Sequence, residues 1–415
     1  MITAAAHPLP VDMSTERTPL LERAAYLAML GFAAAPQVSI AASGILLGLA
    51  AVLWLALVLI HRERIEVPGM FWPLAAYAGI TLVASLFSVD PATSFIDSKQ
   101  LLLFAIVPIA YRLFRGDRSL TAIDVIITVG ALNALYGIVQ YGILDHDNVG
   151  RRVQGNLGHY MTYSGVIMLV ACIAAARVMF RRRDRTWAAL VLPAVVVALA
   201  LTLSRNAWVG ACAGIGTLLL LKDFRLVAIL PVLLGVVVAF APSSVSDRLY
   251  SMLTLDHVRG ASATGVASQQ SNKDRIAMIR TGFRIIRDEP LTGVGPDMVI
   301  QVYPHYRDKQ YAVQQLNPHL HNVPLQIAAE RGLPALAIWL WFIVTLLRDF
   351  LKRRKTSALP SIATAGIAGV IAMLAAGMFE YNFGDSEFLM LFLVLVTLPY
   401  AADRAPCHET ERGAA

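Results

Sequence analysis

The sequence predicts an all-α polytopic membrane protein with about twelve transmembrane helices and one large, largely helical loop between helices nine and ten. The 415-residue chain is 57% hydrophobic and 15% charged, with a mean hydropathy of +0.61. Soluble domains average about 45–50% apolar and about 25% charged residues. Apolar runs close to the ~20 residues that a helix needs to cross a bilayer recur along most of the chain. Every second connection between these runs is short and basic.

The expected spans are apolar runs that end at charged or helix-breaking residues. In chain order they are 24–36, 40–60, 71–89, 101–114, 120–144, 160–180, 187–203, 207–221, 226–242, 323–351, 359–379 and 388–401. The chain is therefore divided into residues 1–242 with nine spans, the large loop 243–320, residues 321–402 with three spans, and a tail, 403–415.

The charges of the connections predict their side of the membrane. Five short connections, after spans two, four, six, eight and ten, are rich in Lys and Arg, as in 181–185 and 352–355. Because such an excess marks cytoplasmic loops, we expect these five and both termini in the cytoplasm, and the large loop outside. The net charge of +7 is explained by these connections, so it does not favour nucleic acid as a partner.

The large loop is rich in arginine and is expected to contain a helix over 275–287. Four apolar residues lie at helical spacing, and three arginines share the other face. The apolar residues are Ile276, Ile279, Phe283 and Ile286, and the arginines are Arg280, Arg284 and Arg287. This basic face fits the wet side of an amphipathic helix on anionic headgroups better than it fits a diphosphate site.

Other arginines at the outer ends of the spans are better candidates for binding phosphate. Arg205 lies where spans seven and eight meet, and a charge there is costly unless it faces protein or water. Its guanidinium stays charged and donates two hydrogen bonds to one anion. Arg275 lies near the start of the loop helix, where free N–H groups attract anions. Arg151 and Arg152 precede span six, and the sequence does not decide between them.

Two histidines close the large loop. His319 and His321 could form a metal pair, but a zinc site needs further ligands, and the spacing to His305 or Glu330 does not demand one. His321 can instead act as a general base, since imidazole titrates near neutral pH, or cap a helix. Asn322 follows His321, and Gln326, Glu330 and Arg331 then lie inside the apolar span ten, where polar side chains indicate a lined cavity.

Several short motifs resemble the O-antigen ligase and polymerase superfamily of bacterial envelopes. His321-Asn322 is followed after nine residues by Gly332, as in the ligase signature, although Ala335 stands where the family usually has Gly, Thr or Tyr. The segments 152–156, 203–208, 274–275 and 290–295 add further similarity in the same order.

The resemblance implies a GT-C-like glycosyltransferase at the periplasmic face of the bacterial inner membrane. Such a ligase transfers polysaccharide from undecaprenyl diphosphate to a sugar hydroxyl of lipid A-core, with inversion, and needs no metal or nucleotide cofactor. We expect His321 to be the general base. The expected diphosphate ligands are Arg205, Arg275 and Arg152, and the possible supporting residues are His319, Asn322, Glu330 and Arg280.

Three alternatives remain open at this point. An O-antigen polymerase and a protein O-oligosaccharyltransferase use the same lipid donor. A solute transporter would instead show paired broken helices and internal pseudosymmetry. The partners expected for the enzyme are the lipid-linked polysaccharide, the lipid A-core acceptor and the surrounding membrane lipids.

Overall fold

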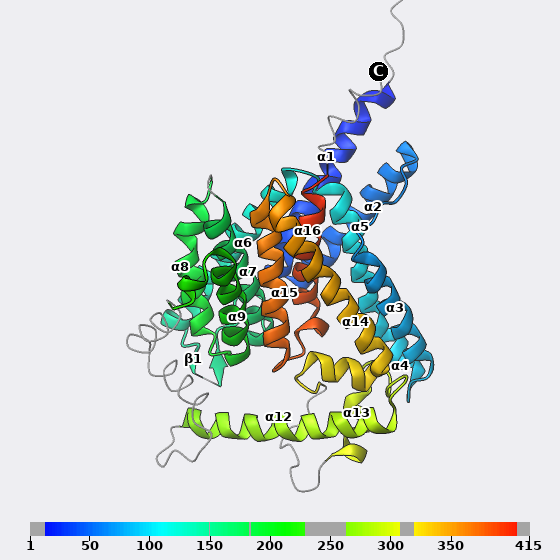
Figure 1. The fold of residues 1–415 in the computed structure, drawn as a ribbon, viewed down its shortest axis with the longest axis vertical. Helices are drawn as coiled ribbons and strands as arrows, with labels where there is room; N and C mark the ends of the chain where they lie inside the picture. The colour runs from blue at the N-terminus through cyan, green and yellow to red at the C-terminus, as the bar shows by residue number, and fades with distance from the viewer. Residues whose placement is uncertain (1–12, 149, 182–183, 229–262, 308–318, 405–415) are drawn as a thin grey trace, which may run out of the picture.

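The computed structural model describes residues 13–148, 150–181, 184–228, 263–307 and 319–404. This part of the chain is helical apart from one small hairpin, as the predicted class requires. Most helices stand side by side in an upright bundle, and the long helix α12 (Ala263–Asp288) runs across one end of it (Figure 1).

The elements before α12 are α1 (Met13–Ala34), η1 (Ala35–Gln37), α2 (Ile40–His61), α3 (Phe71–Leu86), α4 (Pro91–Asp97), η2 (Ser98–Ala105), α5 (Ile106–Leu113), α6 (Arg118–Ile143), β1 (Asp147–Asn148), β2 (Arg151–Arg152), α7 (Tyr160–Phe180), α8 (Thr186–Leu201), α9 (Arg205–Lys222) and η3 (Phe224–Ala228). Those after it are α13 (Val299–Tyr306), α14 (Val323–Thr356), α15 (Pro360–Gly377), η4 (Asn382–Gly384) and α16 (Ser386–Ala401).

Within the described residues, six helical segments are long and apolar enough to cross a membrane. They are Ile40–His61, Pro91–Leu113, Arg118–Ile143, Tyr160–Phe180, Val323–Thr356 and Pro360–Gly377, and α3, α8 and α16 are shorter apolar helices. Most of the predicted ninth span lies outside the described residues. A multi-pass membrane protein is therefore confirmed, whereas the number of twelve spans stays a prediction.

The predicted fourth span differs from the structure. Residues 90–100 were expected to be an outer connection, but Pro91–Asp97 is a helix that continues through η2 into α5. Asp90 caps this helix, since its carboxylate accepts from the backbone N–H groups of Ala92 and Thr93, and Pro91 fits the first helical position.

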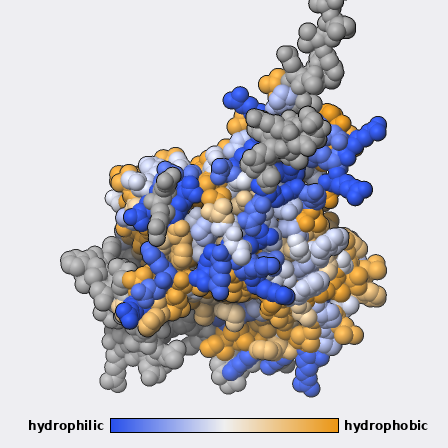
Figure 2. All heavy atoms as spheres, turned by 45° about the horizontal axis from the view of Figure 1, so that its top comes forward, coloured by the Kyte–Doolittle hydropathy of each residue, from blue (hydrophilic) through white to orange (hydrophobic). Residues whose placement is uncertain are grey.

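The five basic connections meet at one end of the bundle, which we call the basic end. Arg112 donates to Glu63 at 2.7 Å, Arg354 donates to the Leu221 carbonyl at 3.0 Å, and Arg177 pairs with Asp124 at 2.9 Å. Figure 2 turns this end toward the viewer and shows hydrophilic side chains gathered there, with hydrophobic ones around the flanks. The basic connections, which are every second connection in the sequence, therefore lie together at one end of the structure.

The core of the bundle is formed by α7, α15 and α16, whose side chains are nearly all buried. Helix α2 lies at the edge and exposes large apolar side chains such as Ile45 and Leu59, at 72% and 67%. A surface of this kind is expected where lipid chains replace water as the solvent.

Helix α12 contains the predicted loop helix, 275–287, for which the sequence did not predict the face that packs against the protein. Ala277, Met278 and Ile285 are buried, whereas Phe283 is 64% exposed. The reason is close packing against the start of α14, because a Cβ on Gly282 would lie 2.7 Å from the Leu325 side chain. No larger residue fits at position 282, and Ile276, Ile279 and Phe283 lie on the exposed side of the helix.

Helix α14 is broken at Gly332, which has φ 80° and ψ 169°. The break frees the carbonyls of Ala329 and Glu330, which accept from the N–H groups of Val294 and Gly295 at 3.0 and 2.9 Å. The 290–295 turn therefore pairs with the broken helix in the manner of two strands. This pairing fixes the entry of α14, where the two predicted histidines lie.

Gly332→Ala is expected to destabilise the protein by at least about 2 kcal/mol, because this backbone region is essentially restricted to glycine. A Cβ would also lie 2.1 Å from the Leu291 carbonyl oxygen. Thermal unfolding in detergent measures the effect. Gly48→Ala in α2 is the control, since a Cβ there meets nothing within 4 Å and alanine favours a helix. Equal melting temperatures for Gly332→Ala and the wild type would contradict this role.

Candidate active site

His321 and Glu380 form an ion-pair geometry at the end of the bundle opposite the basic end. The His321 Nδ1 lies 3.0 Å from both Glu380 carboxylate oxygens. Both side chains are largely buried, with 15% and 13% of their surface exposed. When the carboxylate accepts the Nδ1 proton, the neutral imidazole presents Nε2 as its proton acceptor. The pair is therefore arranged for general base chemistry.

The backbone around His321 is held in an unusual conformation. His321 has φ 50°, in the left-handed region that costs a non-glycine residue free energy. The next residue, Asn322, caps α14 by accepting from Leu325 N–H at 2.9 Å, and its amide donates to the Met378 carbonyl at 3.1 Å. Asn322 therefore ties His321 to the end of α15, from which Glu380 follows. It is a structural support rather than a contact to substrate.

Glu380 was not among the candidates predicted from the sequence. It lies 59 residues after His321, so no short-range motif joins the two. The available signal was a carboxylate directly after the apolar helix α15, at the outer end of a span, where an ionisable group usually has a functional partner.

Burial alone would raise the pKa of the Glu380 carboxyl, but the hydrogen bond and the charge of His321 outweigh it. The net pKa of Glu380 lies below its usual value, and the positive charge of Arg275 acts in the same direction. The carboxylate therefore stays ionised at neutral pH. Its interaction with His321 is lost only as the pH falls through this lowered pKa.

The three arginines predicted to bind diphosphate come from three distant segments and lie within electrostatic reach of one another, and Arg275 is also within reach of Glu380. The charges of Arg275 and Arg152 both act on Arg205, and Arg275 also acts on Arg152 and on Glu380. Burial lowers the pKa of the Arg152 and Arg275 guanidinium groups, yet arginine remains charged at any physiological pH. Three cations held this close repel one another, so a bound anion would be favoured.

Each arginine is positioned by its own element. Arg152 lies in the β1–β2 hairpin, with its guanidinium 4.2 Å from the centre of the Tyr160 ring, whereas Arg151 is exposed. Of the two hairpin arginines, Arg152 is thus the one grouped with Arg205 and Arg275. Arg205 is 7% exposed and is the first residue of α9, whose N-terminus adds positive potential.

The hydroxyl of Ser204, next to Arg205, is buried and has no hydrogen-bond partner among the described residues. A buried polar group without a partner costs free energy unless a ligand or water satisfies it. The unpaired Ser204 hydroxyl therefore indicates a polar ligand or a water molecule beside Arg205.

His319 lies beside the pair but has different surroundings. Its ring packs against Tyr381 with the ring centres 5.1 Å apart. Burial lowers the pKa of His319, and the nearby Glu380 charge only partly offsets this effect. His319 is therefore neutral at neutral pH.

In the part of the chain that the structure describes, no three His, Cys, Asp or Glu side chains group so that they could hold a metal ion.

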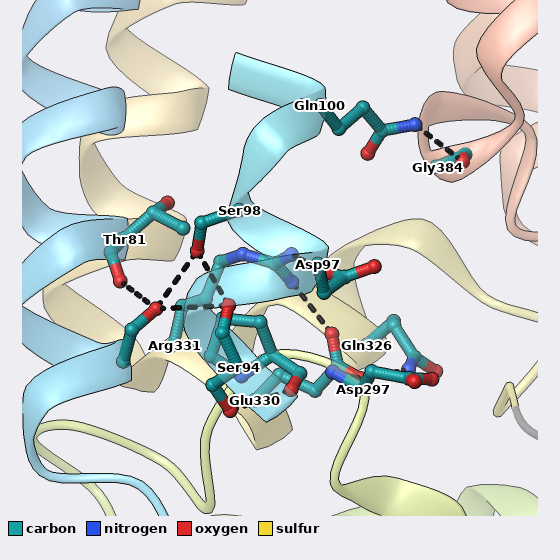
Figure 3. A network of polar contacts seen from close by, with 12 residues as sticks. Thr81, Ser94, Asp97, Ser98, Gln100, Asp297, Gln326, Glu330, Arg331 and Gly384 are labelled. Carbon is teal, nitrogen blue, oxygen red and sulfur yellow. Dashed lines mark hydrogen bonds and ion pairs between the residues drawn. The ribbon is translucent and has the colours of Figure 1, made fainter. Parts of the chain in front are cut away.

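Glu330 is not in the His321 pair but in a separate buried network (Figure 3). It accepts from Gln326 at 2.8 Å and from Arg331 at 2.6 Å, and Arg331 lies 3.7 Å from Asp97. Gln326 in turn accepts from the Leu320 N–H at 2.6 Å. The network connects α4, α14 and the histidine segment, so Glu330 supports the position of His321 indirectly.

Figure 3 also shows how this network extends to α3 and to the loop before α16. The Ser98 hydroxyl lies 2.8 Å from that of Ser85, and Gln100 donates to the Gly384 carbonyl at 2.6 Å. The Gln100–Gly384 hydrogen bond links η2 to the segment that carries Glu380. Arg280, predicted as a supporting residue, is exposed on α12.

Glu380→Gln is expected to lower kcat by at least about tenfold while the KM for the lipid donor changes little, because the carboxylate positions His321 rather than binding substrate. In a His321→Ala background the same change should have no further effect, since coupled residues are not additive. Equal effects of Glu380→Gln with and without His321 would contradict the coupling.

A comparison with known families adds to this geometry. A family model described as O-Antigen ligase matches residues 188–340, a segment that contains Arg205, Arg275, His321 and Gly332. No curated protein matches the chain. The family resemblance seen in the motifs is thus confirmed: this is a multi-pass membrane protein that carries a domain of the O-antigen ligase family.

Proposed function

We propose that this protein is an O-antigen ligase, which transfers a polysaccharide from undecaprenyl diphosphate to a sugar hydroxyl of lipid A-core. The observation that carries the proposal is a group of three arginines that act electrostatically on one another, one of which, Arg275, also acts on Glu380 of the His321–Glu380 pair. The arginines suit a diphosphate leaving group, and the pair suits an alcohol acceptor.

The reaction follows from these roles. The acceptor hydroxyl gives its proton to the Nε2 of His321, while the Nδ1 proton stays on the hydrogen bond to Glu380. The hydroxyl oxygen forms a bond to the anomeric carbon, and the bond from that carbon to the diphosphate oxygen breaks. Arg205, Arg275 and Arg152 stabilise the negative charge that develops on the diphosphate. Direct displacement inverts the anomeric centre and needs no metal ion in this scheme.

The orientation belongs to the same proposal. If the basic end faces the cytoplasm, the arginines and His321 face the periplasm, where both lipid substrates are reached from the outer leaflet of the inner membrane. The N- and C-termini then lie in the cytoplasm. Apolar flanks such as α2 would leave both substrates in contact with the bilayer.

A ligase is preferred to a polymerase because of the spacing from His321-Asn322 to Gly332, the residue at which α14 is broken. In a strain that lacks the protein, the polysaccharide should accumulate on its lipid carrier while the lipid A-core stays uncapped. Long polymer attached to core in that strain would refute the proposal. Short, single-unit caps would favour the polymerase instead.

A further inference from the structure

A pocket with about 170 Å³ of free volume lies beside Glu380. Its walls come from α7, α9, α15, α16 and the loop 380–385, and no lysine or arginine is among the described residues that line it. A buried cavity of about 150 Å³ is known to take a benzene molecule. The pocket therefore has room for one six-membered ring.

The walls combine hydrogen-bonding groups with an apolar floor. Thr162, Asn206 and Asn382 contribute a hydroxyl and two amides, while Ala376 and Phe388 are buried and apolar. Hydroxyl and amide groups together offer both donors and acceptors. A ring that carries hydroxyl groups on its edge and C–H groups on its face matches such walls.

One of these polar groups is buried and lacks a partner. Asn382 is 6% exposed, its amide nitrogen donates to the Met373 carbonyl at 3.1 Å, and its oxygen has no hydrogen-bond partner among the described residues. The Nδ1 of His319, another residue of the wall, is in the same state. Both observations indicate a ligand or water that hydrogen-bonds within the pocket.

The charges of the walls exclude an anion. The carboxylates of Glu380 and Asp385 both line the pocket and lie within electrostatic reach of each other. The Thr162 hydroxyl donates to Asp385 at 2.5 Å, so the Asp385 carboxylate lies next to one of the hydrogen-bonding groups of the pocket. A phosphate would be repelled here, whereas Arg205, Arg275 and Arg152 attract it.

We propose that this pocket binds one neutral pyranose ring of a substrate, in a sugar subsite next to the diphosphate subsite of the arginines. The inference rests on the proposed glycosyl transfer and specifies where its sugar lies. Asn206 follows Arg205 directly at the start of α9, so the same helix end contacts both parts of the site.

The test is the binding of methyl glycosides of glucose, galactose and N-acetylglucosamine, measured by saturation-transfer NMR. The full-length protein is placed in lipid nanodiscs, so that no detergent with a sugar headgroup competes. We expect a saturable signal from at least one glycoside, and inorganic pyrophosphate should not displace it. Asn206→Ala and Thr162→Val should weaken binding about tenfold, the loss of one or two hydrogen bonds.

Thr364→Val is the matched control, since Thr364 is also buried near the N-terminus of a helix but donates to Pro360 and Ser361 carbonyls away from the pocket. It should bind the glycoside normally. His321→Ala should keep glycoside binding while it loses transfer, which separates failure of the subsite from failure of the proposed function.

Kinetics then identify the source of the ring. If Asn206→Ala raises the KM for the lipid-linked donor, the pocket holds the donor sugar, and if it raises the KM for the acceptor, the pocket holds the acceptor sugar. Either outcome supports the subsite. The absence of a saturable signal from all three glycosides, or displacement of the signal by pyrophosphate, would overturn it.

Discussion

His321→Ala should lower the rate of polysaccharide transfer by about 10²–10⁴-fold, which corresponds to about 3–5 kcal/mol of transition-state stabilisation. The reason is that His321 alone combines a proton acceptor with the Glu380 carboxylate at 3.0 Å. The measurement is the lipopolysaccharide ladder in a strain that depends on the variant, together with initial rates for the purified protein.

The change should leave the fold intact, because His321 adopts a left-handed φ of 50° and is held by Asn322 and Glu380 rather than by core packing. Equal abundance in the membrane checks this point. His305→Ala is the control, since His305 is exposed on α13 and contacts Tyr306. A normal ladder with His321→Ala would contradict the assignment of the general base.

Arg205→Lys should lower kcat by roughly 10²-fold although the positive charge remains. Lysine is a point charge and does not reproduce the two parallel hydrogen bonds of a guanidinium. Arg205 is buried at the start of α9 and lies near two further arginines, so its guanidinium group is held in one orientation. Initial rates with the lipid-linked donor measure the loss.

Arg287→Lys is the matched control, because Arg287 lies exposed on α12 at the same end of the molecule. Its transfer rate should equal that of the wild type. If Arg205→Lys retained full activity, the arginine would supply only a general positive potential, and the bidentate contact to phosphate would be wrong.

The sequence predicted the helices well where an apolar run has clear ends. The sixth span, 160–180, has the same limits as α7, because His159 precedes it and Arg181 follows it. Only the start of the fourth span was wrong, because Asp90 and Pro91 start a helix in a segment that looks like a polar loop, and the candidate span runs from Pro91 to Leu113. A capping residue followed by proline was the available signal.

The face of α12 could not be predicted from apolar spacing. The outcome depends on how closely α12 approaches α14, and Gly282 and Ala277 permit an approach that larger residues prevent. Such packing depends on a partner that is distant in the sequence. The same applies to Glu380, whose relation to His321 arises only when α15 packs beside the start of α14.

The candidate arginines and His321 were recognisable because charged groups stand out at the outer ends of apolar helices. Glu330 was also recognised by this signal, but its charge is used within the fold, where it pairs with Arg331. A polar residue in an apolar helix therefore indicates a partner without showing whether that partner is a substrate or another side chain.

The most direct test of the account is a reconstituted transfer reaction. The purified protein, polysaccharide on undecaprenyl diphosphate and lipid A-core are mixed in the presence of a divalent-metal chelator. We predict one undecaprenyl diphosphate released for each capped core, and neither product with His321→Ala. Capped core that forms without diphosphate release, or a reaction that the chelator abolishes and added metal restores, would contradict a metal-independent transfer by His321 and the arginines.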